Sequence, residues 1–536
     1  MFVTFIRSIL SARLALLTLL ALFAGCPMPI LCDAPDVDAG DGDGDGDGDG
    51  DGDGDGDGDG DGDGDGDGDG DGDGDGDGDG DGDGDGDGDG DGDGDGDGDG
   101  DGDGDGDGDG DGDGDGDGDV IGGASLDPSF LDGGKGVLWA QNATVPRGVI
   151  SDGAGGAVVF GGVDYDGINL NEETVFAQRY DDTGAIVSSG ALGATLGSSP
   201  TYVDGMAVTD DGLFTFAGTA DGFSLDTIFA GRLNDDFTYA TGWPDPASTQ
   251  LTQVNFGSLD PGLTNAFAVS DGTTLLIGRA DNNVNSSTAA VFRLDATGAP
   301  DSTFVAAANG SLGIDFLRAS DFETSRFRGI FPALTHGFAL IGTTDASSEV
   351  FVAFADVGGT IDRGEGTNGL VTTPVNASVA SFAFDALRGF YVAQGTGSGV
   401  LLHRVAEDGA LDDTFAEGGT LTVDASPVVM TYGVAPRGLD VDADGKIYLA
   451  GQGLLDGKST VVLLRLLPDG TRDATFGDDG LVAASFSELY VPNASYSAAS
   501  AYCMLVDEES VWVVGLLDEF TAFGAGSRLI ALRALR

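Results

Sequence analysis

The chain has 536 residues and a formal net charge of −72 at pH 7, from 94 acidic and 22 basic residues. Residues 41–118 are 39 consecutive Asp-Gly pairs, and residues 120–536 hold 51 acidic and 20 basic residues, a net charge of −31. Without a basic surface to neutralise phosphates, the composition excludes nucleic acid as a partner and disfavours attraction to an anionic membrane surface.

Residues 1–25 are predicted to be a signal peptide. Arg7 and Arg13 flank an apolar run at 14–24 that is too short to cross a bilayer, and small residues follow it. The stretch Leu-Phe-Ala-Gly-Cys at 22–26 resembles a bacterial lipobox. This resemblance implies a lipid on Cys26, membrane attachment through it, and a location in the bacterial cell envelope as an outer-membrane or surface lipoprotein. The alternatives are a secreted protein with an ordinary signal peptide and an uncleaved anchor.

The three cysteines do not indicate a disulfide framework. If Cys26 is acylated, Cys32 and Cys503 are the remaining pair, and the whole acidic run separates them. Cys503 lies in an apolar stretch and is expected to be a small buried side chain.

Residues 26–124 are predicted to be a disordered acidic linker. Glycine at every second position raises backbone entropy, the run from Asp41 to Asp119 offers no apolar core, and the like charges swell the chain. The run resembles half of an EF-hand loop, but glycine stands where the bidentate glutamate is needed. Weak, diffuse calcium binding is therefore expected, with a structured calcium roll as the alternative, and no other cofactor or metal is predicted.

Residues 125–536 carry a repeated motif between short runs rich in Val, Ile, Phe and Tyr, which predict an all-β fold. The motif Asp-x-x-Phe occurs at 127–130, 301–304, 412–415 and 473–476, and a degraded copy begins at Ile361. Two weaker units begin near Ile186 and Tyr239. Spacings of 50 to 61 residues then give seven units.

Each unit is expected to contain four short strands. The first, as at 438–441, leads through an Asp-Gly turn to a second strand that ends on glycine. The third, as at 461–465, carries an arginine near its end, and the fourth follows the Asp-x-x-Phe motif. Seven such units predict a seven-bladed β-propeller, with six or eight blades as alternatives. The spare strand at 137–141 is expected to pair in the last blade and close the ring.

The pattern at 465–480, Arg-Leu-x-x-Asp-Gly-x-x-Asp-x-x-Phe-Gly-x-x-Gly, resembles the bacterial delta-60 repeat. Residues 125–536 are similar to it most clearly in the first, sixth and seventh units. The resemblance implies a secreted or surface β-propeller and no particular reaction.

The arginine repeated in the third strands is expected to fix blade geometry, because its planar fork matches a carboxylate of the Asp-x-x-Phe motif. These structural arginines are Arg179, Arg232, Arg293, Arg404, Arg465 and Arg533, with Phe354 in the remaining unit. The structural acids are Asp127, Asp301, Asp362, Asp412 and Asp473.

Ligand binding is predicted at one mouth of the central channel, on the connections that lead into the first strands. Three of these connections end in Arg-Gly, and in an acidic domain their arginines suit an anion, a sugar acid or an acidic peptide. The candidates are Arg147, Arg328 and Arg437 with the aromatic residues Phe322, Phe327, Tyr432, Tyr490 and Tyr496. Capping of strand carbonyls and pairing with a local aspartate are the structural alternatives for the arginines.

Catalysis finds little support. His336 is interpreted as a turn residue at the place that Asp444 holds in another unit, and His403 lies in a strand, so no zinc spacing appears. Asp440, Asp442 and Asp444 resemble half a calcium loop but are interpreted as a turn. The predicted function is a monomeric binding module for an unknown protein or glycan. The alternatives are an enzyme that acts on extracellular polysaccharide or another polymer, which would use a pair of acids, and a calcium-responsive acidic spacer.

Overall fold

The structure of this chain is a computed structural model. The residues it describes are 30–31, 120–139, 144–164, 173–191, 201–209, 212–220, 227–240, 252–254, 260–268, 272–281, 287–304, 314–316, 325–333, 336–344, 348–366, 369–376, 380–396, 399–430, 438–489, 496–521 and 524–536. The chain divides into two compact units, residues 38–114 and the remainder, and all described residues belong to the second of these.

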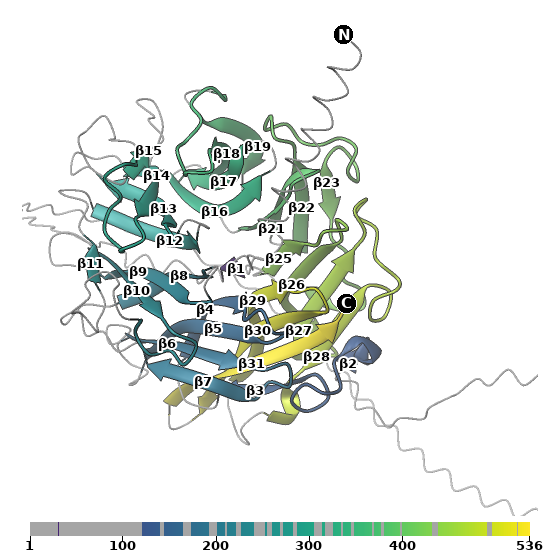
Figure 1. The fold of residues 1–536 in the computed structure, drawn as a ribbon. Helices are drawn as coiled ribbons and strands as arrows, with labels where there is room; N and C mark the ends of the chain where they lie inside the picture. The colour runs from purple at the N-terminus through teal and green to yellow at the C-terminus, as the bar shows by residue number, and fades with distance from the viewer. Residues whose placement is uncertain are drawn as a thin grey trace, which may run out of the picture. The chain divides into compact units, whose positions relative to one another are not determined.

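The described strands form seven antiparallel sheets, built largely from strands that follow one another along the chain (Figure 1). The first sheet contains β4 (Thr144–Ser151), β5 (Ala157–Asp164), β6 (Glu173–Tyr180) and β7 (Ile186–Ala191). The second contains β8 (Thr201–Val208), β9 (Phe214–Ala220), β10 (Thr227–Leu233) and β11 (Thr252–Val254). The third contains β12 (Asp260–Ala268), β13 (Thr274–Asp281), β14 (Ser287–Leu294) and β15 (Ile314–Phe316). The fourth contains β16 (Ser325–Ala333), β17 (Gly337–Thr344), β18 (Glu349–Ala355) and β19 (Val371–Asn376). The fifth contains β20 (Ala380–Asp385), β21 (Gly389–Thr396), β22 (Gly399–Val405) and β23 (Thr420–Thr422). The sixth contains β25 (Gly438–Val441), β26 (Ile447–Leu455), β27 (Lys458–Leu466) and β28 (Leu481–Ser485). The seventh contains β29 (Tyr496–Val506), β30 (Ser510–Thr521), β31 (Gly524–Leu535) and β3 (Lys135–Trp139).

The first strands of neighbouring sheets form a closed cycle. They contact one another in the order β4, β8, β12, β16, β20, β25 and β29, and β29 contacts β4 again. Because each sheet adds its other strands beside its first strand, the sheets are arranged radially around this cycle. The prediction of an all-β β-propeller is therefore confirmed.

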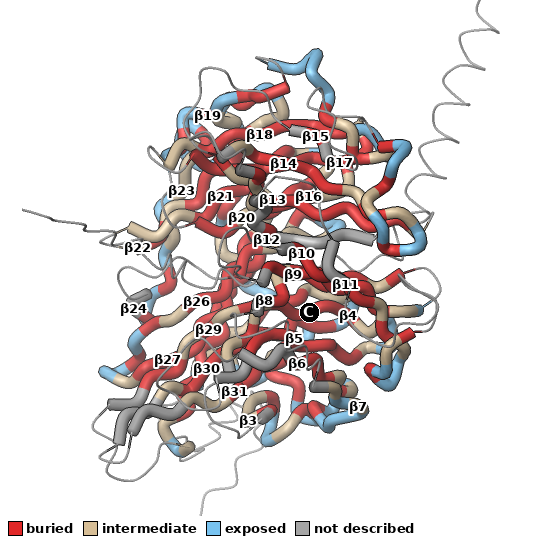
Figure 2. Tube along the Cα trace, turned by 90° about the vertical axis from the view of Figure 1, so that its left-hand side faces the viewer, coloured by how far each residue is buried: buried red, intermediate tan, exposed pale blue. Residues whose placement is uncertain are grey.

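Hydrophobic side chains fill the spaces between neighbouring sheets. One cluster joins Tyr448 of β26 to Val511 of β30, and the next joins Trp512 of β30 to Val159 of β5. Further clusters follow between each pair of adjacent sheets. The buried positions follow the strands and the exposed ones gather at the hairpin ends (Figure 2). Inner strands such as β17 are therefore buried on both faces and read as continuous apolar runs, whereas an outer strand such as β19 alternates buried and exposed residues.

The strand expected to close the ring pairs with the end of the chain. β3 lies antiparallel to β31, with Lys135 opposite Leu532 and Gly136 opposite Ala531. The backbone N–H of Asp127 also donates to the carbonyl of Arg533 (3.0 Å). The last sheet thus takes its outer strand from the N-terminal side of the repeats.

Three short strands and two 3₁₀ turns lie outside this repeat. β1 (Ile30–Leu31) pairs with β4, β2 (Val120–Ile121) pairs with β28, and β24 (Val429–Met430) pairs with β26 beside β25. The 3₁₀ turns are η1 (Gly123–Ser125) and η2 (Ser487–Leu489). These additions give two sheets more than the expected four strands.

Two expectations need correction. The linker was expected to extend to residue 124, but Val120 pairs with Ala484 and Ile121 with Ala483, so strand pairing begins before residue 125. Cys503 is buried as expected, but it is disulfide-bonded, so it is not simply a small apolar side chain. The other two cysteines and the Asp-Gly run lie outside the described residues. Among the described residues, no helix is long and apolar enough to span a membrane.

Candidate functional site

A β-bulge recurs in the first strand of five sheets. In each case one residue is skipped in the pairing between the first and second strands. The skipped residues are Arg147 in β4, Asp204 in β8, Thr264 in β12, Arg328 in β16 and Tyr502 in β29. We call these five residues the bulge ring, because the strands that carry them follow one another around the closed cycle. Bulges redirect a side chain, and they are frequent beside binding sites.

The glycine on which the second strands were expected to end lies inside them instead, as Gly161 does in β5, and it explains the bulges. The residue before each bulge lies opposite such a glycine, as Pro146 lies opposite Gly161 and Phe327 opposite Gly342. A Cβ on Gly161 would lie 2.1 Å from the carbonyl oxygen of Val145 on the first strand. Only glycine therefore permits this close approach of the two backbones.

The structure places the predicted arginines differently from the sequence analysis. Arg147 and Arg328 lie within strands β4 and β16, not on the connections that precede them, because the first strands begin earlier than expected. Both side chains are partly buried. Phe327 is fully buried and packs against Phe351 (centroids 5.8 Å apart), so it belongs to the core and is not a ligand candidate.

The remaining mouth candidates cannot be placed. Arg437, Tyr432, Tyr490 and Phe322 lie outside the described residues, and Tyr496 begins β29 with a side chain that is not described. Arg437 immediately precedes Gly438, the first residue of β25, as Arg147 precedes Gly148. The likeness is one of sequence, because Arg437 lies outside the described residues.

Two of the bulged side chains, those of Asp204 and Arg328, contact the second strand of their own sheet. The hydroxyl of Thr219 donates to Asp204 Oδ2 (2.8 Å), and Nε of Arg328 donates to the Oγ1 of Thr343 (3.3 Å). Both threonines directly follow the repeated glycine of their strand. In the third sheet, Arg279 holds this position, after Gly278. Sequence reasoning missed Arg279 and Asp204. Arg279 could have been identified as the residue after the repeated glycine, and Asp204 as the residue that the bulge skips.

The repeat arginines lie at the other end of the sheets, beside the Asp-x-x-Phe motifs. Nε lies close to the motif carboxylate in Arg293–Asp301 (3.1 Å), Arg404–Asp412 (2.8 Å) and Arg465–Asp473 (2.9 Å), and Arg533 forms an ion pair with Asp127. The arginine also lies over the motif phenylalanine, as Arg465 does over Phe476 at 4.4 Å. These contacts fit a structural role.

Two of the units that carry the arginine vary this arrangement. Arg179 pairs instead with Asp152 of the turn after β4 (2.9 Å). Arg232 donates to Thr215 Oγ1 (3.2 Å) and to the Gly272 carbonyl (3.2 Å), because Ala240 stands where the motif has aspartate.

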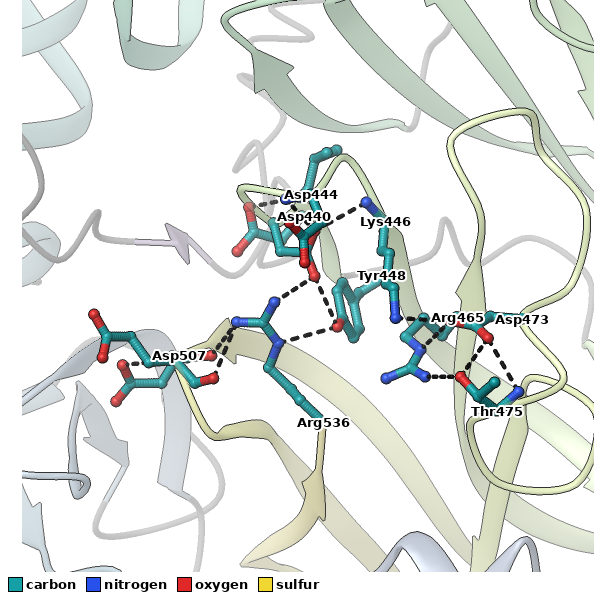
Figure 3. Close-up of polar contacts among 12 residues, drawn as sticks. Asp440, Asp444, Lys446, Tyr448, Arg465, Asp473, Thr475, Asp507 and Arg536 are labelled. Carbon is teal, nitrogen blue, oxygen red and sulfur yellow. Dashed lines mark hydrogen bonds and ion pairs between the residues drawn. The ribbon is translucent and has the colours of Figure 1, made fainter. Parts of the chain in front are cut away.

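A polar network joins the sixth and seventh sheets near the turn after β25 (Figure 3). Arg536 forms an ion pair with Asp442 and donates from Nε to the hydroxyl of Tyr448 (3.2 Å). Asp442 Oδ1 accepts the N–H groups of Asp444 (3.0 Å) and Lys446 (2.9 Å). The half calcium loop is therefore a turn held by its own aspartate.

Asp440 is the most perturbed acid of this network. Burial, helped by the neighbouring charge of Asp442, raises its pKa to about 7. Its Oδ1 accepts a hydrogen bond from Val441 N (2.8 Å). The carboxyl group thus holds its proton up to about neutral pH, well above the ordinary aspartate pKa of about 3.9.

Replacing Asp440 with asparagine is expected to change how stability depends on pH. The folded wild type binds one more proton than the unfolded chain between about pH 4 and pH 7, so this group's contribution falls as pH rises through 7. D440N removes that loss, and urea unfolding at pH 8 should show a gain on the order of 4 kcal/mol over wild type. The gain should vanish at pH 4, and D444N, in the exposed turn, should show none. Equal gains at both pH values would contradict this assignment.

His403 has a structural environment. Its Nδ1 lies 3.0 Å from the hydroxyl of Thr420 and its Nε2 lies 3.3 Å from Oε1 of Gln394, and burial lowers its pKa. Both ring nitrogens are therefore engaged within the fifth sheet.

Comparison with known proteins agrees with the fold. Residues 270–304 and 443–476 match a family model described as a domain of unknown function (DUF5122), β-propeller. The chain therefore contains a β-propeller domain. No curated protein matches it.

Several solved structures are similar at low identity. A calcium-binding protein, regucalcin, from Agrobacterium tumefaciens is 12% identical, with 58% of this chain and 88% of that chain covered and a TM-score of 0.27. The polysaccharide lyase Uly1 is 11% identical, with 70% and 88% covered and a TM-score of 0.35. Prolyl oligopeptidase B from Galerina marginata is 12% identical, with 75% and 52% covered and a TM-score of 0.36. Similarities this low identify no ligand and no reaction.

Proposed function

We propose that this chain is a lipid-anchored protein of a bacterial cell envelope whose seven-bladed propeller binds an anionic ligand at the bulge ring. The seven sheets and the closed cycle of their first strands support the blade count. The observation that carries the function is the bulge ring itself. It places Arg147 and Arg328 at equivalent positions of two first strands, and the sequence places Arg437 at a third.

The chemistry of this ring suits an acidic glycan or an acidic peptide. Arginine offers a planar fork of donors for a carboxylate, and the surrounding domain is otherwise acidic. Arg279 adds another guanidinium after the repeated glycine of β13. A bulge holds each side chain on a strand rather than on a flexible loop, which lowers the entropic cost of binding.

Removing an arginine of the bulge ring should weaken binding. With oligomers of polygalacturonate as the probe, R147Q and R328Q should each lower affinity about tenfold, the loss expected for one charge-assisted hydrogen bond. Isothermal titration at two salt concentrations measures this. R472Q is the charge-matched control, because Arg472 contacts the carbonyls of Ser426 and Asp479 elsewhere. Equal losses in all three variants, or tighter binding of neutral dextran, would contradict the proposal.

The disulfide of Cys503 provides a test of the lipid anchor. Within the chain, Cys503 can pair only with Cys26 or Cys32, since there are three cysteines. A lipid on Cys26 leaves Cys32, which follows the strand β1. Mapping of disulfide peptides by mass spectrometry should give Cys32–Cys503 and a diacylated Cys26. A Cys26–Cys503 peptide would exclude the lipid anchor.

The pairing of β1 and β2 changes the role proposed for the Asp-Gly run. Ile30–Leu31 pairs with β4 and Val120–Ile121 with β28, so the run connects two segments that both join the propeller. We propose that the run is an acidic spacer between these two segments, rather than between the lipid anchor and the propeller. The calcium-responsive alternative predicts that small-angle scattering shows a smaller molecule with Ca²⁺, and unchanged dimensions would reject it.

The enzyme alternative is favoured by one observation, the raised pKa of Asp440 beside Asp442. A carboxyl group that keeps its proton near neutral pH, beside a second carboxyl group, is what acid-assisted hydrolysis of a glycosidic bond requires. Turnover of a polysaccharide that D440N abolishes would support it over the binding module.

A further inference from the structure

Three potential metal ligands meet at one end of the fourth sheet. One atom each of His336, Asp362 and Glu365 can be chosen so that all lie within 4.8 Å of one another. His336 lies in the turn before β17, and the two acids follow β18. The imidazole Nε2 lies 3.7 Å from Oε1 of Glu365, too long for a good hydrogen bond.

The fourth unit is also where the repeated arginine is missing. The N–H of Asp362 donates to the carbonyl of Phe354 (2.8 Å), just as Asp473 N–H donates to the carbonyl of Arg465 (3.1 Å). Phe354 therefore occupies the arginine position, and the motif acid Asp362 lacks the guanidinium that its equivalent has. The fourth unit thus has Phe354 at the arginine position and a histidine, His336, in the same unit.

The surrounding contacts hold two of the ligands in place. The His336 ring stacks on Phe354, with centroids 4.4 Å apart and planes 27° apart. Asp362 Oδ1 accepts the N–H of Gly364 (2.9 Å), which fixes its carboxylate. Glu365 is about half exposed, so a rotation of its side chain can bring it to the others.

This donor set suits a transition-metal ion better than calcium. One imidazole nitrogen with two carboxylates binds Zn²⁺ well, whereas Ca²⁺ takes oxygen ligands and more of them. Ligands of a tetrahedral zinc lie about 3.4 Å apart, given bonds of about 2.0–2.1 Å. The three ligand atoms therefore need to move only slightly toward one another to bind the ion, and water would complete its coordination.

We propose that His336, Asp362 and Glu365 form a site for one divalent transition-metal ion, with Zn²⁺ as the test ion. The ion supplies the positive charge that arginine supplies to the motif acid in four other units. The site lies away from the bulge ring, at the end of the sheets that carries the Asp-x-x-Phe motifs. The site cannot be recognised from the sequence spacing, because the histidine and the acids come from different hairpins.

The experiment uses the full chain and titrates Zn²⁺ in the presence of excess Ca²⁺, which is added to compete for carboxylates of the acidic run. The chain has two histidines, so imidazole signals in NMR report on them separately. We expect one equivalent of Zn²⁺ to shift the signals of His336 and to leave those of His403 unchanged. H336Q should lower the affinity at least tenfold, and E365Q should weaken it as well.

D444N is the control, because it removes one exposed carboxylate from the corresponding turn of another blade, and it should bind Zn²⁺ as wild type does. All the altered side chains are partly or fully exposed, and circular dichroism checks that each variant folds. Equal Zn²⁺ affinity in H336Q and wild type, displacement of Zn²⁺ by Ca²⁺, or no measurable binding would overturn the proposal.

Discussion

Replacing Asp473 with alanine is expected to lower the free energy of unfolding by about 3–5 kcal/mol, the cost of leaving a buried charge without its partner. The side chains of Arg465 and Asp473 are 3% and 4% exposed. Asp473 also accepts hydrogen bonds from the hydroxyl of Thr475 (2.6 Å) and contacts Lys446 Nζ at 3.1 Å. The substitution therefore removes the centre of a buried network, and urea unfolding followed by tryptophan fluorescence measures the loss.

The equivalent substitution in the fifth sheet is the control. Asp412 pairs with Arg404 in the same way, but its side chain is 21% exposed. D412A should cost about 1–2 kcal/mol, because water partly replaces the lost contacts. Equal costs at both positions would show that burial does not set the strength of these pairs.

The same network predicts sensitivity to acid. Burial opposes ionisation of Asp473, but the hydrogen bonds from Thr475 and the charges of Lys446 and Arg465 hold its pKa well below the usual range. A depressed pKa gives stability that is present above the ordinary aspartate value of about 3.9 and lost as pH falls toward the folded value. The destabilisation caused by D473A should therefore shrink below about pH 4.

Replacing Arg533 with alanine should open the ring as well as destabilise it by about 3–5 kcal/mol. Arg533 pairs with Asp127, 406 positions away, and donates to Ser510 Oγ (3.1 Å) and to the carbonyl of Asp182 (2.8 Å). These contacts hold the first Asp-x-x-Phe motif against the last sheet. Hydrogen exchange in R533A should therefore become faster in β3 and β31 than in the other strands.

R179A is the matched control, since Arg179 and its partner Asp152 belong to a single sheet. Its effect on exchange should stay within β4 to β6 and leave β3 protected. Unchanged protection of β3 in R533A would mean that the backbone pairing with β31 closes the ring without help from this ion pair.

Much of the fold was predictable because each unit repeats its local rules. The Asp-Gly turns, the apolar runs and the spare strand predicted at 137–141 led to an all-β propeller, and a strand at Lys135–Trp139 pairs beside β31. The arginines and motif acids were predictable as partners, because a planar cation and a carboxylate recur at fixed spacing in the units.

The rest depends on contacts between units, which no single repeat encodes. The glycine repeated in the second strands was recognised, but its role in the bulge that displaces Arg147 follows only from the pairing of two strands. The raised pKa of Asp440 comes from burial between two sheets, and the pairing of β1 and β2 involves segments outside the repeats. The cluster around His336 needs ligands from separate hairpins.

The most direct test of a binding site at the bulge ring is hydrogen exchange of the protein with and without polygalacturonate oligomers. Bound ligand should slow exchange of the amides in β4, β8, β12, β16 and β29, around Arg147, Asp204, Thr264, Arg328 and Tyr502. Protection that appears instead at the turn after β25 and at the Asp-x-x-Phe motifs, or no protection at saturating ligand, would contradict it.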